Sequence, residues 1–180
     1  LTTPIESGGV LGPVWDWLTE FTDEKKLQPG AALSWEQAAD GLSWTFKLRQ
    51  GIKFHDGVEL TAEDVRFTLM EAFRRPEARS SRAGQFRKDI QDVEVLDPYT
   101  VRIRTVGPWA TLPHDLSNQP GIEGIVMPKG YTQQVGWERF PEKPIGSGPW
   151  KFVRHEVGNR VEFEAVKEHR TPPKFDRLQT

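Results

Sequence analysis

The sequence predicts an α+β fold of mixed sheets, built from antiparallel hairpins and short helices. Three observations support this prediction. Residues 42–49 alternate between apolar and polar side chains, Asp56-Gly57 is a tight-turn signal, and 16 glycines and 14 prolines divide the 180 residues into short segments. Because hairpins pair their strands antiparallel, a purely parallel βαβ arrangement is not expected.

The first thirty residues predict a helix and a turn. Val14, Leu18 and Phe21 recur at helical spacing, which predicts a short helix over residues 10–21. The Gln-Pro-Gly sequence at residues 28–30 then predicts a turn.

Residues 42–49 predict a half-buried strand, because strict alternation places successive side chains on opposite faces of a sheet. The side chains expected to be exposed are Ser43, Thr45 and Lys47. The side chains expected to be buried are Leu42, Trp44, Phe46 and Leu48. The Asp56-Gly57 pair that follows predicts a hairpin turn, since both residue types tolerate positive φ.

Thr61 predicts the start of a helix. Its hydroxyl is suited to cap the amide of Asp64, and acidic residues in the first turn complement the positive end of the helix dipole. The expected buried stripe consists of Val65, Leu69, Met70 and Phe73. Residues 74–76 (Arg-Arg-Pro) end the helix, because a residue before proline disfavours the helical conformation.

The rest of the chain predicts further short elements. Turn-forming residues at 141–149 indicate a crossing between subdomains. The predicted elements are a polar loop with one helical turn (78–88), a hairpin with strands near 93–95 and 101–103 around a turn at 97–100, helices at 109–116 and 129–135, a hairpin with strands at 150–153 and 161–165, and the start of a strand at 175–180.

Composition excludes several classes of protein. The chain has no cysteine, which excludes disulfides and thiolate zinc sites. It contains no apolar window of roughly 18 residues, the length that spans a bilayer. The net charge is −2, so a nucleic-acid-binding role has little support. The basic segment at 74–88 is better interpreted as a solvated loop.

No catalytic constellation is evident. A structural role is favoured for His55, at a turn, and for His114, and no spacing typical of metal ligands occurs. Asp16 and Glu20 are spaced to share a helix face, which is a weak signal for glycoside hydrolysis. The Gly-Ser-Gly sequence around Ser147 lacks the context of a phosphate loop or a nucleophile elbow.

The segment from Glu6 to Gly9 precedes the first predicted helix. Its backbone amides are candidates for contacts with a ligand, because the start of a helix leaves amides unpaired. Helix capping by Ser7 is an equally good interpretation. Four tryptophans are candidates either for the core or for the wall of a cleft: Trp15, Trp17, Trp109 and Trp137.

Residues 42–69 also match a known signature. They contain the pattern W-x-F-x-L-R-x-G-x-x-F-x-D-G-x-x-x-T-A-x-D-V, which closely resembles that of the peptide/nickel class (family 5) of solute-binding proteins of ATP-binding cassette (ABC) importers. Residues 28–35, 126–129 and 144–152 resemble further landmarks of this family in the same order. Residues 162–169 stand where the family has an Asn and a Tyr-Trp pair, which this chain lacks.

The resemblance implies an N-terminal fragment of an α/β two-lobed periplasmic-binding-protein fold (type II-like). Under this interpretation residues 1–17 belong to the first lobe, 18–146 form the extra subdomain of the peptide-binding class, 147–180 return to the first lobe, and the second lobe is missing. The positions that match the ligand cleft are Glu6, Ser7, Gly8 and Gly9.

The resemblance also implies a function. The expected role is to capture a peptide-like or other small solute by hinge closure and deliver it to membrane permease subunits, without enzymatic activity, cofactor, metal or nucleic acid. The expected location is periplasmic or cell-surface, with a lipid anchor as one option. Weak solute binding and self-association are expected of a fragment.

Two other functions stay open from the residues themselves. One is a hydrolase or metal-dependent enzyme that uses the scattered histidines and carboxylates, which would need a convergent polar cluster in a pocket. The other is a nucleic-acid-associated module that uses residues 74–88, which would need strongly salt-dependent binding.

Overall fold

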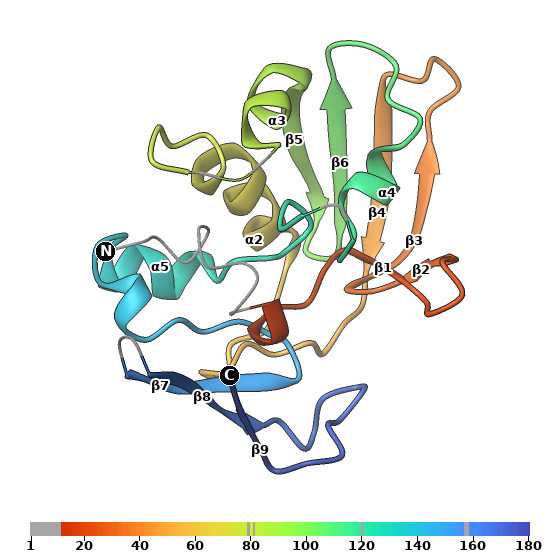
Figure 1. Ribbon diagram of the computed structural model, residues 1–180. Coiled ribbons are helices and arrows are strands. Elements are labelled where there is room, and N and C mark those ends of the chain that lie inside the picture. Colours follow the sequence, from red (N-terminus) through yellow and green to blue (C-terminus); the bar gives the residue numbers. More distant parts are fainter. Residues whose placement is uncertain (1–11, 79, 81, 120, 157–158) are drawn as a thin grey trace.

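The computed structural model describes residues 12–78, 80, 82–119, 121–156 and 159–180, which form three antiparallel sheets and several short helices (Figure 1). The elements in chain order are η1 (Gly12–Val14), β1 (Thr19–Phe21), β2 (Leu27–Pro29), β3 (Ala32–Gln37), β4 (Ser43–Leu48), α2 (Ala62–Phe67), η2 (Thr68–Ala72, π-helical), α3 (Ala83–Asp89), β5 (Ile90–Asp97), β6 (Thr100–Thr105), α4 (Leu112–Asp115), α5 (Lys129–Val135), η3 (Phe140–Glu142), β7 (Trp150–Glu156), β8 (Arg160–Ala165) and β9 (Arg177–Gln179).

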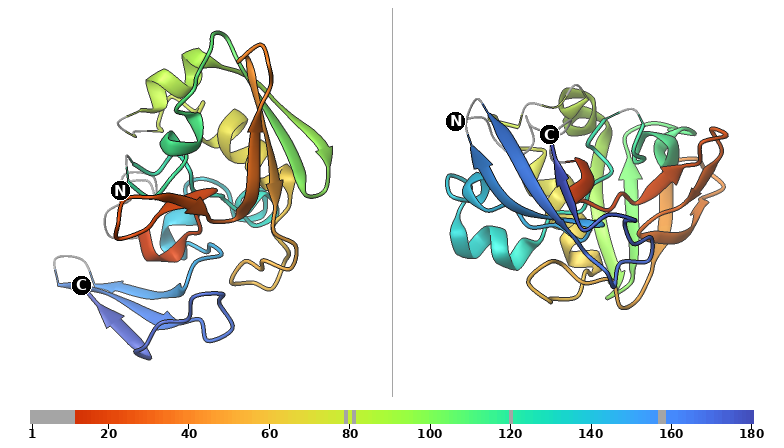
Figure 2. Two further views of the ribbon diagram at one scale, coloured as in Figure 1. Left: turned by 90° about the vertical axis from the view of Figure 1, so that its right-hand side faces the viewer. Right: turned by 60° about the horizontal axis from the view of Figure 1, so that its bottom comes forward.

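The largest sheet has four strands in the order β3-β4-β6-β5, and α2 packs against β5 and β6. A separate sheet, β7-β8-β9, lies below it in Figure 1 and is set apart from the rest in the left view of Figure 2. We call β7-β8-β9 the C-terminal sheet. It contacts η1 through β7, so the N-terminal and C-terminal segments of the described chain meet at one seam.

Strand β4 confirms the predicted strand but only part of its predicted alternation. Phe46 and Leu48 are buried and Lys47 is exposed, as expected. At the start of the strand the expectation is wrong: Leu42 is 39% exposed, whereas Ser43 is only 8% exposed. Trp44 is half-buried, and its indole donates a hydrogen bond to the carbonyl of residue 109 at 2.9 Å.

The predicted helix over residues 10–21 is wrong for the residues that the structure describes. Only Gly12–Val14 form a 3₁₀ turn, and Thr19–Phe21 form β1. The backbone amides instead find partners far along the chain: Leu18 N donates to Gly124 O at 2.8 Å, and Ala31 N donates to Trp17 O at 2.7 Å. These long-range bonds replace the i to i−4 bonds that a helix would need.

The predicted helix at Thr61 is confirmed. The Thr61 amide donates to Asp64 Oδ2 at 2.9 Å, which completes a capping interaction at the start of α2. The other oxygen of Asp64 accepts the Lys129 amide at 2.9 Å, so the same carboxylate holds the start of α5. The Thr68 hydroxyl donates to Asp64 O at 2.7 Å and accepts the Met127 amide at 2.8 Å. The helix becomes π-helical at Thr68, where this hydroxyl enters the backbone ladder.

The later elements follow the predictions closely. Helix α5 has the predicted bounds, the hairpins β5–β6 and β7–β8 form, and β9 confirms the predicted C-terminal strand. The turn near Asp56 is confirmed by a bond from Gly57 N to Phe54 O at 2.8 Å, but only Gly57 has positive φ. Helix α3 is longer and α4 shorter than expected. Strands β2 and β3 were not predicted, and the expected turn at 28–30 begins inside β2.

Candidate functional site

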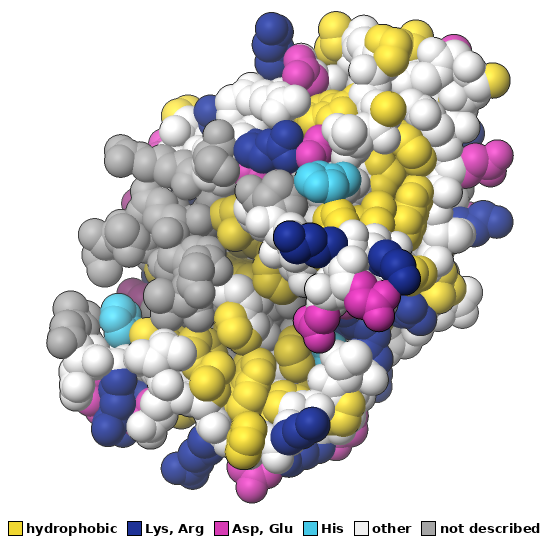
Figure 3. Space-filling model, turned by 45° about the vertical axis from the view of Figure 1, so that its right-hand side comes forward, with side chains coloured by type: hydrophobic (Ala, Val, Ile, Leu, Met, Phe, Trp, Pro, Cys, Tyr) yellow, Lys and Arg dark blue, Asp and Glu magenta, His cyan; other side chains and the backbone are white. Residues whose placement is uncertain are grey.

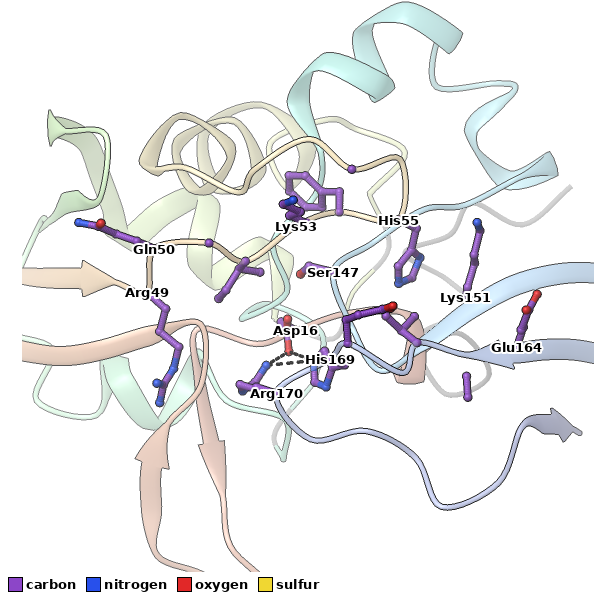
Figure 4. A pocket seen from close by; sticks show the side chains of 17 residues that line it. Asp16, Arg49, Gln50, Lys53, His55, Ser147, Lys151, Glu164, His169 and Arg170 are labelled. Carbon is purple, nitrogen blue, oxygen red and sulfur yellow. Dashed lines mark hydrogen bonds and ion pairs between the residues drawn. The ribbon is translucent and has the colours of Figure 1, made fainter.

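Two cavities meet at the seam between the C-terminal sheet and the rest of the fold. The first, which we call the loop cavity, has a volume of about 770 Å³ and lies between the loop at 49–57 and the segment at 164–170 (Figure 4). The second, which we call the tryptophan cavity, has a volume of about 580 Å³ and includes Trp15 and Trp17. The residues that line both cavities are Asp16, His169 and Arg170.

A buried ionic cluster separates the two cavities. Asp16 is 1% exposed, and its Oδ1 accepts hydrogen bonds from His169 Nε2 at 3.1 Å and from the Arg170 guanidinium. Arg170 also binds the carboxylate of Glu20. The helix face that the spacing of Asp16 and Glu20 predicts is wrong, because no helix joins these two residues. One arginine from beyond β8 brings them together.

The charges of this cluster shift two pKa values in opposite directions. Burial raises the pKa of Asp16, but the hydrogen bond from His169 and the charge of Arg170 outweigh it and leave this pKa below its usual value. Burial, together with the nearby charge of Asp16, raises the pKa of Glu20 above its usual value despite Arg170. Asp16 is therefore the more firmly ionised of the two carboxylates.

Both ring nitrogens of His169 have polar neighbours. Nε2 lies 3.1 Å from Asp16 Oδ1, and Nδ1 lies 3.1 Å from the amide nitrogen of Thr171. Both ring nitrogens are engaged in holding the chain in place. This histidine therefore has no nitrogen available to activate a nucleophile.

His55 has the turn-stabilising role that was expected of it. Its amide donates to Gly146 O at 2.8 Å, its Nδ1 accepts from Gly146 N at 3.3 Å, and its Nε2 therefore donates to Gly148 O at 3.0 Å. Burial lowers the pKa of His55 below its usual value. The two glycines are required by packing: a Cβ at position 148 would lie 2.6 Å from the backbone nitrogen of Trp15, and a Cβ at position 146 would collide with the Val14 carbonyl.

The predicted ligand residues Glu6, Ser7, Gly8 and Gly9 lie outside the described residues. Of the four candidate tryptophans, Trp109 is buried in the core and Trp137 stacks on Phe67 at 5.5 Å. Trp15 is buried yet borders the tryptophan cavity, and Trp17 is half-buried on its wall.

Sequence reasoning missed the cluster residues His169 and Arg170 and the amide side chains of Asn118 and Gln119 in the tryptophan cavity. No local pattern marks them, because their partners lie far away in the sequence. The sequence offered one signal for this cluster: His169 and Arg170 stand where the family has its Tyr-Trp pair.

The basic segment at 74–88 is used inside the fold. Arg74 donates to Ile90 O at 2.7 Å, and Arg82 forms an ion pair with Asp115 at 2.5 Å. The pair with Asp115 of α4 anchors the start of α3, and the same carboxylate also accepts the Trp109 indole N–H at 2.7 Å. These contacts give Arg74 and Arg82 structural partners within the described chain.

The described residues give little support to the alternative function of a hydrolase or metal-dependent enzyme. Among them, no group of three or more His, Asp or Glu side chains converges to hold a metal ion. The hydroxyl of Ser147 has no hydrogen-bond partner in the described chain, so no histidine activates it. No helix within the described ranges is long and apolar enough to cross a membrane.

Comparison with known proteins identifies the family. The profile of the bacterial extracellular solute-binding proteins, family 5 (Middle), matches residues 26–180. The chain belongs to this family. Family 5 proteins are binding proteins rather than enzymes, so the expectation of no enzymatic activity is confirmed at the level of the family.

Individual relatives support the assignment. The chain is 31% identical to di/tripeptide-binding protein 2 of Pseudomonas aeruginosa, over 92% of this chain and 35% of that protein. It is 29% identical to the periplasmic oligopeptide-binding protein OppA of Haemophilus influenzae, over 91% of this chain and 32% of that protein. The chain therefore spans about a third of the length of these relatives.

Solved structures of the family share the fold. NikZ from Campylobacter jejuni, in complex with Ni(L-His), matches with a TM-score of 0.83 and 35% identity over 94% of this chain and 34% of its own. MoaA from A. tumefaciens R10, in complex with mannopinic acid, matches with a TM-score of 0.85 and 31% identity over 98% of this chain and 36% of its own. The predicted fold class, part of a family 5 binding-protein fold with antiparallel sheets and short helices, is confirmed.

Proposed function

We propose that this chain is part of the extracytoplasmic solute-binding component of an ABC importer. In this role it captures a peptide-like or other small solute between two lobes that close about a hinge, and it delivers the solute to membrane permease subunits. The location proposed for it is periplasmic or at the cell surface. The names of the relatives above, which include di/tripeptide- and oligopeptide-binding proteins, support this proposal.

The observation that carries the proposal is the chemistry of the tryptophan cavity. Trp15 and Trp17 supply apolar surface, and Asn118 and Gln119 supply amide groups. The Asn118 Oδ1 already accepts the Phe21 amide at 2.9 Å, so the group that Asn118 can offer to a ligand acceptor is its NH₂. An apolar wall with a few amide donors suits the carbonyl groups of a peptide backbone.

The organisation of the chain is part of the same proposal. Residues 1–17 and 147–180 contribute to one lobe and residues 18–146 form an additional subdomain. In support, the C-terminal sheet lies wholly within 147–180, whereas β1 to β6 and the α-helices lie within 18–146. Glu6, Ser7, Gly8 and Gly9, which precede the first described residue of the tryptophan cavity, are proposed to add contacts with the solute.

Calorimetric titration of the 180-residue chain with di- and tripeptides tests the proposal. The chain spans about a third of its relatives and supplies one wall of such a cleft, so the expected dissociation constant is about 1 mM or weaker. The Gln119→Ala variant is expected to weaken binding further, and Gln91→Ala, an exposed glutamine on β5, is the matched control. Equal binding by both variants, or no binding by the unmodified chain at about 50 mM peptide, would contradict the proposal.

A further inference from the structure

The loop cavity carries charged side chains that no described residue neutralises. Arg49, Lys53 and Lys151 line it, and none of them has a carboxylate within 4.0 Å in the described chain. Glu164 and Glu168 line the same cavity and also have no cationic partner within that distance. Lys151 and Glu164 are cross-strand neighbours in β7 and β8, yet their charged groups do not meet. Charges of both signs are therefore available to a ligand (Figure 4).

Two buried oxygen atoms of the same cavity have no partner among the described residues. Asp16 Oδ2 and Ser147 Oγ belong to side chains of residues that are 1% and 3% exposed, and neither atom has a hydrogen-bond partner. Leaving a buried polar group unsatisfied costs about 1–3 kcal/mol, so such groups need an explanation. The packing of Gly146 and Gly148 against residues 13–15 places Ser147 beside the segment that carries Asp16.

We propose that the loop cavity is a second binding site, for a small zwitterion such as an α-amino acid or a dipeptide. Asp16 and Ser147 receive the ammonium group, and Lys53 and Lys151 receive the carboxylate. This site goes beyond the tryptophan cavity of the proposed function, which borders Asp16 from the other side.

The charge pattern selects a zwitterion over a simple ion. An ammonium group has three donors, which satisfy a carboxylate oxygen and a hydroxyl together. A lone anion would meet the repulsion of Glu164 and Glu168, and a lone cation would meet that of Lys53 and Lys151. The volume of about 770 Å³ lies within the range of known small-molecule sites and holds a dipeptide.

The ammonium group binds beside Arg170. Both unpartnered oxygens are shielded from solvent, and the Arg170 guanidinium occupies only Oδ1 of Asp16 and the carboxylate of Glu20. The ligand ammonium therefore binds Oδ2, the other oxygen of Asp16, while Arg170 keeps both of its bonds. The buried carboxylate is paired with a positive charge before and after the ligand binds.

Chemical-shift mapping of the ¹⁵N-labelled 180-residue chain tests the site. The probes are L-alanyl-L-alanine, its N-acetyl derivative, which lacks the ammonium group, and its C-terminal amide, which lacks the carboxylate. With the unmodified dipeptide, the amides of Gly51, Gly57 and Ser147 are expected to shift saturably. Each derivative is expected to bind about tenfold more weakly, the loss that corresponds to one charged hydrogen-bonded contact.

Variants of the protein test which residues bind the carboxylate end of the ligand. Lys53 and Lys151 are exposed, so the double variant Lys53→Ala/Lys151→Ala folds, and it is expected to lose about tenfold for the dipeptide and nothing for the amide derivative. Lys47→Ala, an exposed lysine on β4, is the matched control. The dispersion of the amide spectrum reports the folding of every variant.

The outcomes distinguish this site from the proposed function. Shifts confined to the Trp17 indole and the Gly121 amide would overturn the second site and leave the tryptophan cavity as the solute site. Shifts at Gly51, Gly57 and Ser147 that the N-acetyl derivative reproduces with equal affinity would also overturn it. The absence of any saturable shift at these three amides would overturn it in the same way.

Discussion

The imidazole of His169 donates a hydrogen bond to Asp16 across 153 positions of the chain, at 3.1 Å. With Arg170, which bridges Asp16 and Glu20, this bond connects the segment after β8 to the segment before β1. The C-terminal sheet also contacts η1 through β7, and Gly148 N, just before β7, donates to Val14 O at 2.9 Å. The polar cluster adds a second connection between the same two parts of the fold, and it lies between the two cavities.

Removal of Arg170 tests how much the ionic cluster contributes to the free energy of unfolding. Arg170→Ala leaves the buried Asp16 carboxylate with one hydrogen bond and no cation, which is expected to lower the free energy of unfolding by about 3 kcal/mol. Urea denaturation measures the loss. Arg154→Ala, which breaks an exposed pair with Glu162, is the control and is expected to lose less than about 1 kcal/mol. Equal losses would mean that the cluster is no more than a surface ion pair.

The glycines of the 146–148 loop are required by space. Gly148→Ala would place a Cβ 2.6 Å from the backbone nitrogen and oxygen of Trp15, and it is expected to destabilise the fold by about 2 kcal/mol or more. Gly84→Ala, in α3, meets no atom within 4 Å and is expected to stabilise by about 0.5–1 kcal/mol. Thermal denaturation of both variants checks the opposite signs. Two changes of the same sign would contradict the packing argument.

The protonation of His55 links stability to pH. Because burial lowers its pKa below the usual 6.5, the unfolded state binds the proton more readily than the folded state. The resulting stability is fully present above pH 6.5 and is lost as the pH falls from 6.5 toward the folded pKa. The pH dependence of urea unfolding should therefore slope upward below pH 6.5, and His55→Gln should flatten this slope. A His55 ring resonance that titrates above 6.5 would contradict the prediction.

The two aromatic residues of β4 should differ in energetic importance. Phe46 is fully buried, and Phe46→Ala is expected to cost about 3–5 kcal/mol. Trp44 is half-buried, so Trp44→Ala is expected to cost distinctly less. Chemical denaturation of the two variants gives the comparison. A larger loss at Trp44 would show that its hydrogen bond to the carbonyl of residue 109 outweighs its exposure.

Strand β7 predicts self-association. In the part of the chain that the structure describes, β7 pairs only with β8, and Val153 on it is 49% exposed. Apolar side chains also gather low on the face shown in Figure 3, at the height of the C-terminal sheet. An unpaired edge next to apolar surface favours pairing with a second copy. Sedimentation at high concentration is expected to show a dimer that Val153→Lys weakens, and a strict monomer would contradict this.

Local patterns predicted the elements whose bonds are local. The helix at Thr61 has its capping partner three residues away, and the β5–β6 hairpin closes around a four-residue turn, so both follow from adjacent residues. The 42–69 signature identified the family because it lies within one continuous run of chain. The later match of residues 26–180 to that family extends this identification over most of the chain.

Tertiary structure decided the N-terminal segment and the site. Val14, Leu18 and Phe21 have helical spacing, yet their segment forms a 3₁₀ turn and β1 because its amides bond to residues about a hundred positions away. Asp16 offered only a spacing to Glu20, and nothing near it in the sequence indicated an arginine and a histidine from beyond β8. Periodicity reports which side chains prefer to be buried, whereas the partners of a buried charge are set by how distant segments pack. The cluster between the two cavities is therefore a property of the folded chain alone.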